Sequence, residues 1–143
     1  MIKPNLTNSI LVVALLFIAG LGCKTMTEGK PAAEKAVTRF HQMLGEEKYA
    51  DIYRESSKMM KDAATEEDMA KLFRAVNSKL GKVTSTQNQN WKVGNFNLVS
   101  TVELIQNTQF EKGKGTEQFV FEIDGSEAKL AGYYINSMDL ISE

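Results

Sequence analysis

The chain is poor in the residues that most often carry chemistry, with one cysteine, one histidine and one tryptophan among 143 residues. A lone cysteine excludes an internal disulfide, and a zinc site needs several Cys, His or carboxylate ligands at set spacing. We therefore predict neither a metal site nor a cofactor. The formal net charge is −1, from 17 basic and 18 acidic residues. This balance lacks the basic footprint of a nucleic-acid-binding domain.

Catalytic motifs are also missing. The sequence has no Gly-x-Ser-x-Gly elbow, and Gly113-Lys114-Gly115 lacks the spacing of a phosphate-binding loop. No catalytic residue is assigned on this evidence, so a non-enzymatic function is favoured.

An apolar run near the N-terminus spans residues 10–21 and ends directly before Gly22 and Cys23. It is shorter than the about 20 residues that a membrane-spanning helix needs. Lys3 precedes it, and Gly20 and Gly22 supply small residues at its end, which is the pattern of a cleaved secretory signal. We therefore interpret residues 1–22 as a signal peptide.

The Gly22-Cys23 ending resembles the lipobox of bacterial lipoproteins, although Gly20 stands where leucine is commonest and Leu21 where a small residue is usual. The resemblance implies that Cys23 becomes the first mature residue and carries acyl chains such as palmitate. Several chains on one residue give a stable membrane anchor, whereas one chain binds only marginally. Lys24 in place of aspartate favours the outer membrane over the inner one, by resemblance to enteric lipoproteins.

The mature chain begins with helical periodicity. Residues 23–31 are interpreted as the lipidated cysteine and a short tether, because Gly29 and Pro31 interrupt them. Apolar residues four, three and four positions apart then predict a helix from Ala32 to Leu44. A shorter helix is predicted over residues 47–59. A third begins after Thr65, whose hydroxyl can cap it, and ends at Gly81.

Strands follow the helices. The polar tract after Val83 predicts a half-exposed strand, or a strand plus a loop, up to Val93. Alternating apolar residues predict strands over 98–106 and 118–123. Gly113–Gly115 is interpreted as a turn, and Asp124-Gly125 is typical of a hairpin. Residues 129–136 form the last predicted strand.

Three helices followed by about four antiparallel strands predict an α+β domain over residues 32–143. Three features also resemble the nuclear-transport-factor-2-like, or cystatin-superfamily, cone of small bacterial envelope families. These are the segment 40–53, the Leu80-Gly81 end of the third helix, and the terminal hairpin through 119–123 and 130–135. The resemblance implies three helices on a curved sheet around a pocket. A scaffold of this kind does not by itself define a function.

His41 is the only histidine, and histidine is the natural general base near neutral pH. A catalytic interpretation pairs it with a carboxylate such as Asp51 and with an inward Tyr49 or Tyr53. We prefer the interpretation that His41 lies at the edge of the apolar face of its helix, with its ring in contact with solvent and no catalytic role.

Aromatic residues of the sheet are the other candidates for a pocket or a contact surface. Tyr133 and Tyr134 are expected on opposite faces of the last strand, and Trp91 lies in a polar segment where it could touch a partner. Ordinary sheet packing is the preferred explanation of these residues.

The sequence therefore favours a lipid-anchored envelope protein that faces the periplasm and binds a small apolar ligand or an envelope protein. One alternative is a small pocket enzyme, of isomerase or hydrolase type, that uses His41 or a buried carboxylate. Another is a structural subunit of an envelope complex. The family resemblance also implies a homodimer through the sheet.

Overall fold

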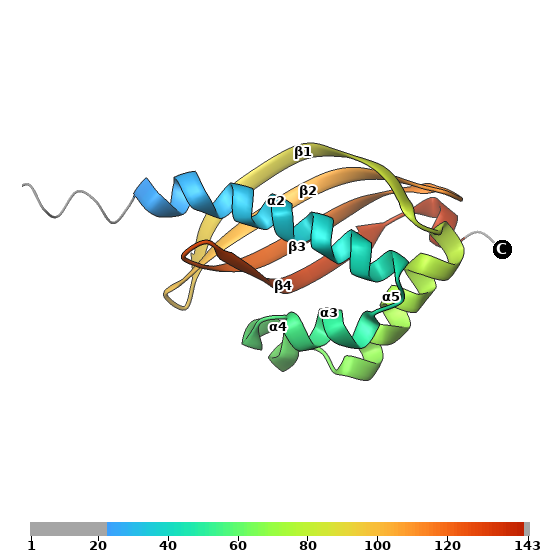
Figure 1. Cartoon of the computed structure of the whole chain (residues 1–143), viewed down its shortest axis with the longest axis horizontal. Coiled ribbons are helices and arrows are strands. Elements are labelled where there is room, and N and C mark those ends of the chain that lie inside the picture. The colour runs from blue at the N-terminus through green and yellow to red at the C-terminus, as the bar shows by residue number, and fades with distance from the viewer. Residues whose placement is uncertain (1–22, 142–143) are drawn as a thin grey trace, which may run out of the picture.

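The computed structural model describes residues 23–141, with side chains from residue 28 onward. It is an α+β fold in which four helices precede four strands (Figure 1). The elements are α2 (Cys23–Gly45), α3 (Tyr49–Glu55), α4 (Lys58–Ala63), α5 (Glu66–Leu80), β1 (Val83–Phe96), β2 (Val99–Phe110), β3 (Lys114–Asp124), β4 (Glu127–Asn136) and the 3-10 turn η2 (Met138–Leu140). The predicted α+β class is confirmed, while residues 23–141 contain four α-helices rather than the predicted three.

Helix α5 has the ends that the sequence predicts. The Thr65 hydroxyl accepts a hydrogen bond from the Asp68 backbone N–H at 3.2 Å, which satisfies one free donor of the first turn. Gly81 ends the helix with a φ of 77°. Its missing side chain permits this left-handed conformation.

The two earlier helical predictions need correction. Helix α2 begins at Cys23 rather than at Ala32, so Pro31 lies inside it and the segment interpreted as a tether is helical. The helix predicted over 47–59 is two short helices. Ser56 and Ser57 are extended between α3 and α4, and the Ser57 N–H donates to the Leu130 carbonyl of β4 at 2.9 Å. This bond to the sheet, together with the Ser57 cap on α4, explains the break.

The strands form one antiparallel sheet in the order β1-β2-β3-β4. The polar tract in β1 continues as a strand, with a bulge between Asn88 and Asn90. The Asp124-Gly125 hairpin is confirmed, with Gly125 at a φ of 60°. The turn predicted at Gly113–Gly115 lies slightly earlier, because β3 already begins at Lys114.

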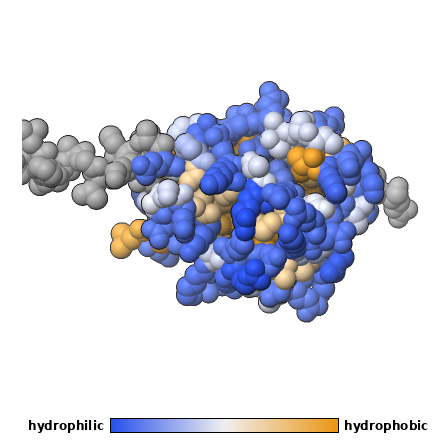
Figure 2. Space-filling view, viewed as in Figure 1, coloured by the Kyte–Doolittle hydropathy of each residue, from blue (hydrophilic) through white to orange (hydrophobic). Residues whose placement is uncertain are grey.

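The helices lie against one face of the sheet and leave the other open (Figure 1). Helix α2 crosses β2, β3 and β4, α4 packs against β4, and α3 packs on α5. Alternate residues of β2 and β3 point into this layer, as predicted, with Val102, Leu104, Phe119 and Phe121 fully buried. Polar side chains dominate the face seen in Figure 2. Among the described residues, no helix is long and apolar enough to cross a membrane.

Candidate functional site

A buried carboxylate lies in the layer between α2 and the sheet. The Glu117 side chain, on β3, has no exposed surface. Its Oε2 atom is 2.8 Å from His41 Nε2 and accepts a hydrogen bond from the Thr108 hydroxyl at 2.5 Å. Its Oε1 atom accepts a hydrogen bond from the Tyr133 hydroxyl at 2.7 Å. We call these four residues, His41, Thr108, Glu117 and Tyr133, the Glu117 network.

Simple strand and helix geometry assembles this network. Side chains two residues apart in a strand share a face, so Glu117 projects from β3 on the same side as Phe119. Tyr133 is the β4 partner of Phe119 and lies on that face too. His41 follows Phe40 on α2, and its ring contacts Phe119 edge-on at a centroid distance of 5.7 Å. Aromatic rings therefore surround the carboxylate.

The hydrogen bonds of the network offset the free-energy cost of burying the Glu117 carboxylate. An ionised carboxylate in an apolar core is costly unless it is paired and hydrogen-bonded. Glu117 receives three protein donors, one of which, His41, can carry positive charge. Burial, and then the charge of Glu117 and the hydrogen bond to it, raise the pKa of Tyr133 well above its usual value of 10.0. Tyr133 therefore remains a neutral hydrogen-bond donor at neutral pH.

This raised pKa predicts a stability effect at alkaline pH. In the unfolded chain Tyr133 ionises near pH 10, whereas in the folded protein it must stay protonated. The hydroxyl's contribution to folding is therefore complete below pH 10 and declines as the pH rises. Tyr133→Phe is expected to cost about 1.5–3 kcal/mol at pH 7, because a bond to a charged group is lost. Urea unfolding should show this difference shrinking above pH 10; a constant difference at all pH values would contradict it.

One polar atom beside the network has no partner. Gln106 on β2 is the register partner of Glu117, and its Oε1 atom is buried without a hydrogen bond from any described residue. Such an atom costs about 1–3 kcal/mol.

Sequence reasoning missed Glu117 and Thr108, although a signal was available. Continuing the apolar alternation of β3 back from Phe119 by two residues places Glu117 on the buried face. Continuing β2 onward from Leu104 places Gln106 and Thr108 there. Polar residues at core positions were thus detectable, but their partner on α2 was not.

The pairing considered for His41 is wrong. Asp51 forms an ion pair with Arg54 at 2.7 Å on the surface of α3. The hydroxyl of Tyr49 accepts a hydrogen bond from Asn77 of α5, and that of Tyr53 donates to the Ala64 carbonyl. Neither tyrosine contacts the Glu117 network. The His41 ring is also nearly buried, with 9% of the side chain exposed, rather than solvated.

Of the aromatic candidates on the sheet, only Tyr133 belongs to the Glu117 network. Tyr133 is buried and Tyr134 is 62% exposed, which confirms that they occupy opposite faces of β4. Trp91 is partly exposed on β1, where Lys30 Nζ lies 5.6 Å from its ring centroid. The structure does not bring Trp91 or Tyr134 together with His41.

His41 also borders a groove of about 440 Å³ between the C-terminal half of α2 and the start of β1. Its other lining residues include the polar side chains of Thr38, Gln42, Lys82 and Thr86. The Glu117 network thus reaches the surface at His41.

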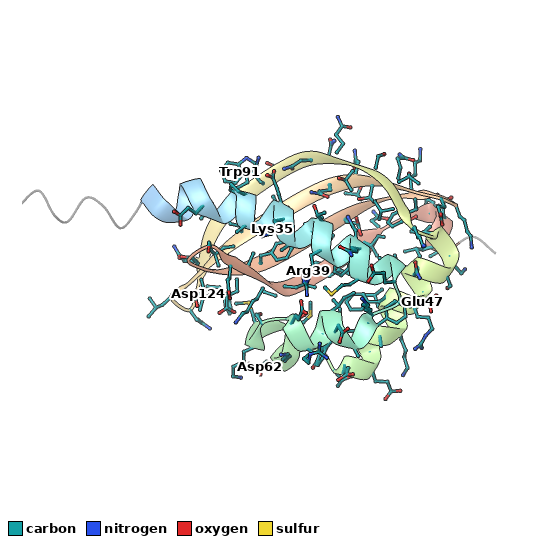
Figure 3. The ribbon with its side chains drawn as sticks, viewed as in Figure 1. Lys35, Arg39, Glu47, Asp62, Trp91 and Asp124 are labelled. Carbon is teal, nitrogen blue, oxygen red and sulfur yellow. The ribbon has the colours of Figure 1, made fainter. Side chains whose placement is uncertain are left out.

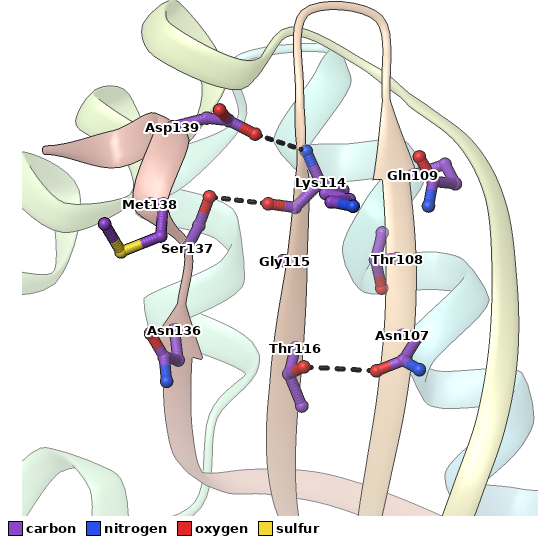
Figure 4. A pocket seen from close by; sticks show the side chains of 10 residues that line it. All are labelled: Asn107, Thr108, Gln109, Lys114, Gly115, Thr116, Asn136, Ser137, Met138 and Asp139. Carbon is purple, nitrogen blue, oxygen red and sulfur yellow. Dashed lines mark hydrogen bonds between the residues drawn. The ribbon is translucent and has the colours of Figure 1, made fainter. Parts of the chain in front are cut away.

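A second groove, of about 460 Å³, lies at the end of the sheet (Figure 4). Its polar groups bond to one another: the Ser137 hydroxyl donates to the Lys114 carbonyl at 2.6 Å, and the Lys114 N–H donates to Asp139 at 3.0 Å. These bonds tie η2 to β3, so the groove is better explained as a structural junction.

A third groove, larger than these two at about 550 Å³, lies between α2, the α3–α4 segment and the β3–β4 hairpin. We call it the basic groove, because five basic and two acidic side chains line it: Lys35, Arg39, Arg54, Lys61 and Lys129, with Glu55 and Glu127. Figure 3 shows Lys35 and Arg39 on the side of α2 that faces α3.

Charge in the basic groove is only partly neutralised. Arg39 donates two hydrogen bonds to the Glu55 carboxylate, at 2.7 and 2.9 Å. This hydrogen-bonded pair lowers the pKa of Glu55 below its usual value. Within the described residues, Lys35 and Lys129 form no ion pair, so their charges are available to a ligand.

The fold and the network together define a small α+β domain with a charged group enclosed in an aromatic core. Residues 36–133 match the DUF4019 family, whose description is "protein of unknown function". The match covers most of the chain and contains the whole Glu117 network, so the chain belongs to this family. Comparison with curated proteins gives no match. Within the described residues, no group of three or more His, Cys, Asp or Glu side chains could hold a metal ion.

Proposed function

We propose that this protein is a lipid-anchored component of the bacterial envelope, held in the outer membrane by acyl chains on Cys23 and facing the periplasm. The apolar run over 10–21 and the Gly22-Cys23 junction support this proposal. Helix α2 starts at Cys23 and extends past the sheet (Figure 1). It would hold the domain close to the membrane.

The domain itself is proposed to bind rather than to catalyse, on a nuclear-transport-factor-2-like scaffold. The order of elements and the helices on one face of the sheet support the scaffold. Aromatic rings fill the interior, namely those of Phe40, Phe73, Phe119 and Tyr133. The pocket that Phe40 lines has a volume of only about 60 Å³. Both oxygens of Glu117 are held by protein donors. These facts favour a surface site over an interior one.

The observation that carries the binding proposal is the charge of the basic groove. Five basic side chains line it in a chain whose overall charge is −1. Lys35 lies on α2 and Lys129 on β4, and Arg39 is paired with Glu55. A concave surface with an excess of one sign of charge concentrates ligands of the opposite sign, and basic side chains outnumber acidic ones in this groove. The proposed ligand is a carboxylate-rich segment of another envelope protein.

The anchor is tested by Cys23→Ala in a Gram-negative host. The variant is expected to lose labelling by radioactive palmitate and to keep residues 1–22, because the lipobox resemblance implies that cleavage before residue 23 depends on the acylated cysteine. Wild-type chain carried through the same protocol is the reference. Cys23→Ala protein that is still labelled and has lost residues 1–22 would refute the proposed anchor.

The groove is tested by titrating an oligoglutamate peptide into the detergent-solubilised full chain. Lys35→Gln with Lys129→Gln should weaken binding at least tenfold, and added salt should weaken wild-type binding, because exposed charges are screened. The control is the double variant Lys71→Gln with Lys114→Gln, which removes the same amount of positive charge from outside the groove. Its affinity for the peptide should change little. Equal loss in both double variants would show non-specific attraction instead of a site.

A second candidate function has one specific observation in its favour: a buried carboxylate orients His41 at the edge of a groove. That arrangement could make His41 the base of a small pocket enzyme. The chain has one histidine, so the ultraviolet absorbance of carbethoxylated imidazole, formed with diethyl pyrocarbonate, reports on His41 alone. Rapid modification of the folded protein would keep this candidate open. Complete protection until unfolding would remove it, because a base must be reachable by its substrate.

A further inference from the structure

The turn between β1 and β2 exposes two large apolar side chains. Leu98 is fully exposed and Phe96 is 55% exposed. The turn residues Asn97 and Leu98 both have positive φ, at 49° and 67°. We call residues 96–98 the hairpin tip.

Leucine is an unfavourable choice at this position. Two-residue turns with positive φ favour Asn followed by Gly, and a bulky residue with φ above zero is an outlier. A side chain wholly in water contributes no buried surface in return. Neither folding nor packing explains Leu98, and strained positions of this kind often serve a function.

The hairpin tip lies at the same end of the molecule as Cys23. A Cβ atom on Gly29 would lie 3.2 Å from Val102, so α2 crosses β2 there. From Gly29 the helix runs about 9 Å further to Cys23, at about 1.5 Å per residue. From Val102 the strand runs roughly 10 Å back to Val99, beside the tip, at about 3.3 Å per residue. His41 meets Glu117 at the other end of the helix, which fixes the direction.

The figures agree with this arrangement. In Figure 1, the β1–β2 turn and the start of α2 lie on the left side of the molecule. Figure 2 shows an apolar group projecting from the same side. Trp91, five residues before the tip on β1, contacts Lys30 of α2. Tryptophan and lysine are both suited to a membrane–water interface.

We propose that the hairpin tip inserts Leu98 and Phe96 into the lipid surface that holds Cys23. The proposal rests on the acylated anchor proposed above, because the anchor keeps this end of the domain beside the bilayer. Two apolar side chains bind a membrane weakly on their own but can orient a domain that acyl chains already hold there. The basic groove is then held at a fixed height above the membrane.

The test uses the acylated full chain in vesicles of phosphatidylethanolamine and phosphatidylglycerol. Trp91→Phe removes the only tryptophan, and Leu98→Trp then places a reporter at the tip. Met138→Trp in the same background is the matched control, since Met138 is exposed at the opposite end of the sheet. Brominated lipids are expected to quench the reporter at 98 several-fold more than the one at 138, with emission at shorter wavelength. Circular dichroism verifies that both variants fold.

The outcomes separate the two proposals. Palmitate labelling of the same samples reports the anchor independently. Labelled protein with equal, weak quenching at both positions would overturn tip insertion and leave the anchor intact. Absence of label would overturn the anchor, and tip insertion would be rejected with it.

Discussion

Replacing Glu117 by leucine is expected to lower the free energy of unfolding by about 3–5 kcal/mol, a large part of the about 5–15 kcal/mol typical of a domain. The substitution leaves the hydroxyls of Thr108 and Tyr133 without their acceptor in the core. It also leaves His41 beside an apolar group. Urea unfolding should show a lower midpoint at an unchanged slope.

A conservative variant separates the loss of hydrogen bonds from the loss of volume. Glu117→Gln keeps the shape and one acceptor oxygen, so a smaller loss of about 1–3 kcal/mol is expected. His41→Leu combined with Glu117→Leu should cost less than the sum of the single changes, by about 0.5–3 kcal/mol, because the two groups interact directly. Strict additivity would show that the 2.8 Å contact contributes nothing.

Phe119→Ala is expected to cost about 3–5 kcal/mol, the usual range for removing a buried phenylalanine. Phe119 is fully buried and its ring lies 5.2 Å from those of Phe40 and Tyr133, centroid to centroid. The cavity would also loosen His41, which packs edge-on against this ring. Thermal unfolding of the purified variant measures the effect.

Tyr134→Ala is the matched control for Phe119→Ala. It removes an aromatic ring from the next strand, but Tyr134 is mostly exposed on the open face. A change within about 0.5 kcal/mol is expected, as for most surface substitutions. Comparable losses at both positions would contradict the assignment of the core to the helix-covered face.

Local sequence signals predicted the elements that depend on local chemistry. The Thr65 cap, the Gly81 end of α5 and the Asp124-Gly125 turn are each determined by one or two side chains, and all three are confirmed. Alternation along β2 and β3 likewise predicted which face is buried, because one face must meet the helices.

Features that depend on contacts between residues far apart in the sequence could not be predicted from local signals. The break between α3 and α4 depends on a bond from Ser57 to Leu130, far along the chain. His41 and Glu117 are 76 residues apart in sequence, so no spacing rule pairs them. A lone histidine at the edge of an apolar helix face is usually solvated. The contact that buries His41 could not be predicted, because it depends on α2 packing across β3, where Glu117 lies.

The most direct test of the proposed lipid anchor is the intact mass of the wild-type chain extracted from host membranes. The account predicts the mass of residues 23–143 plus the acyl and diacylglyceryl groups on Cys23, with fragmentation placing the added mass on that residue. An unmodified chain, whether it begins at Met1 or at a later residue, would contradict the anchor and the membrane role derived from it.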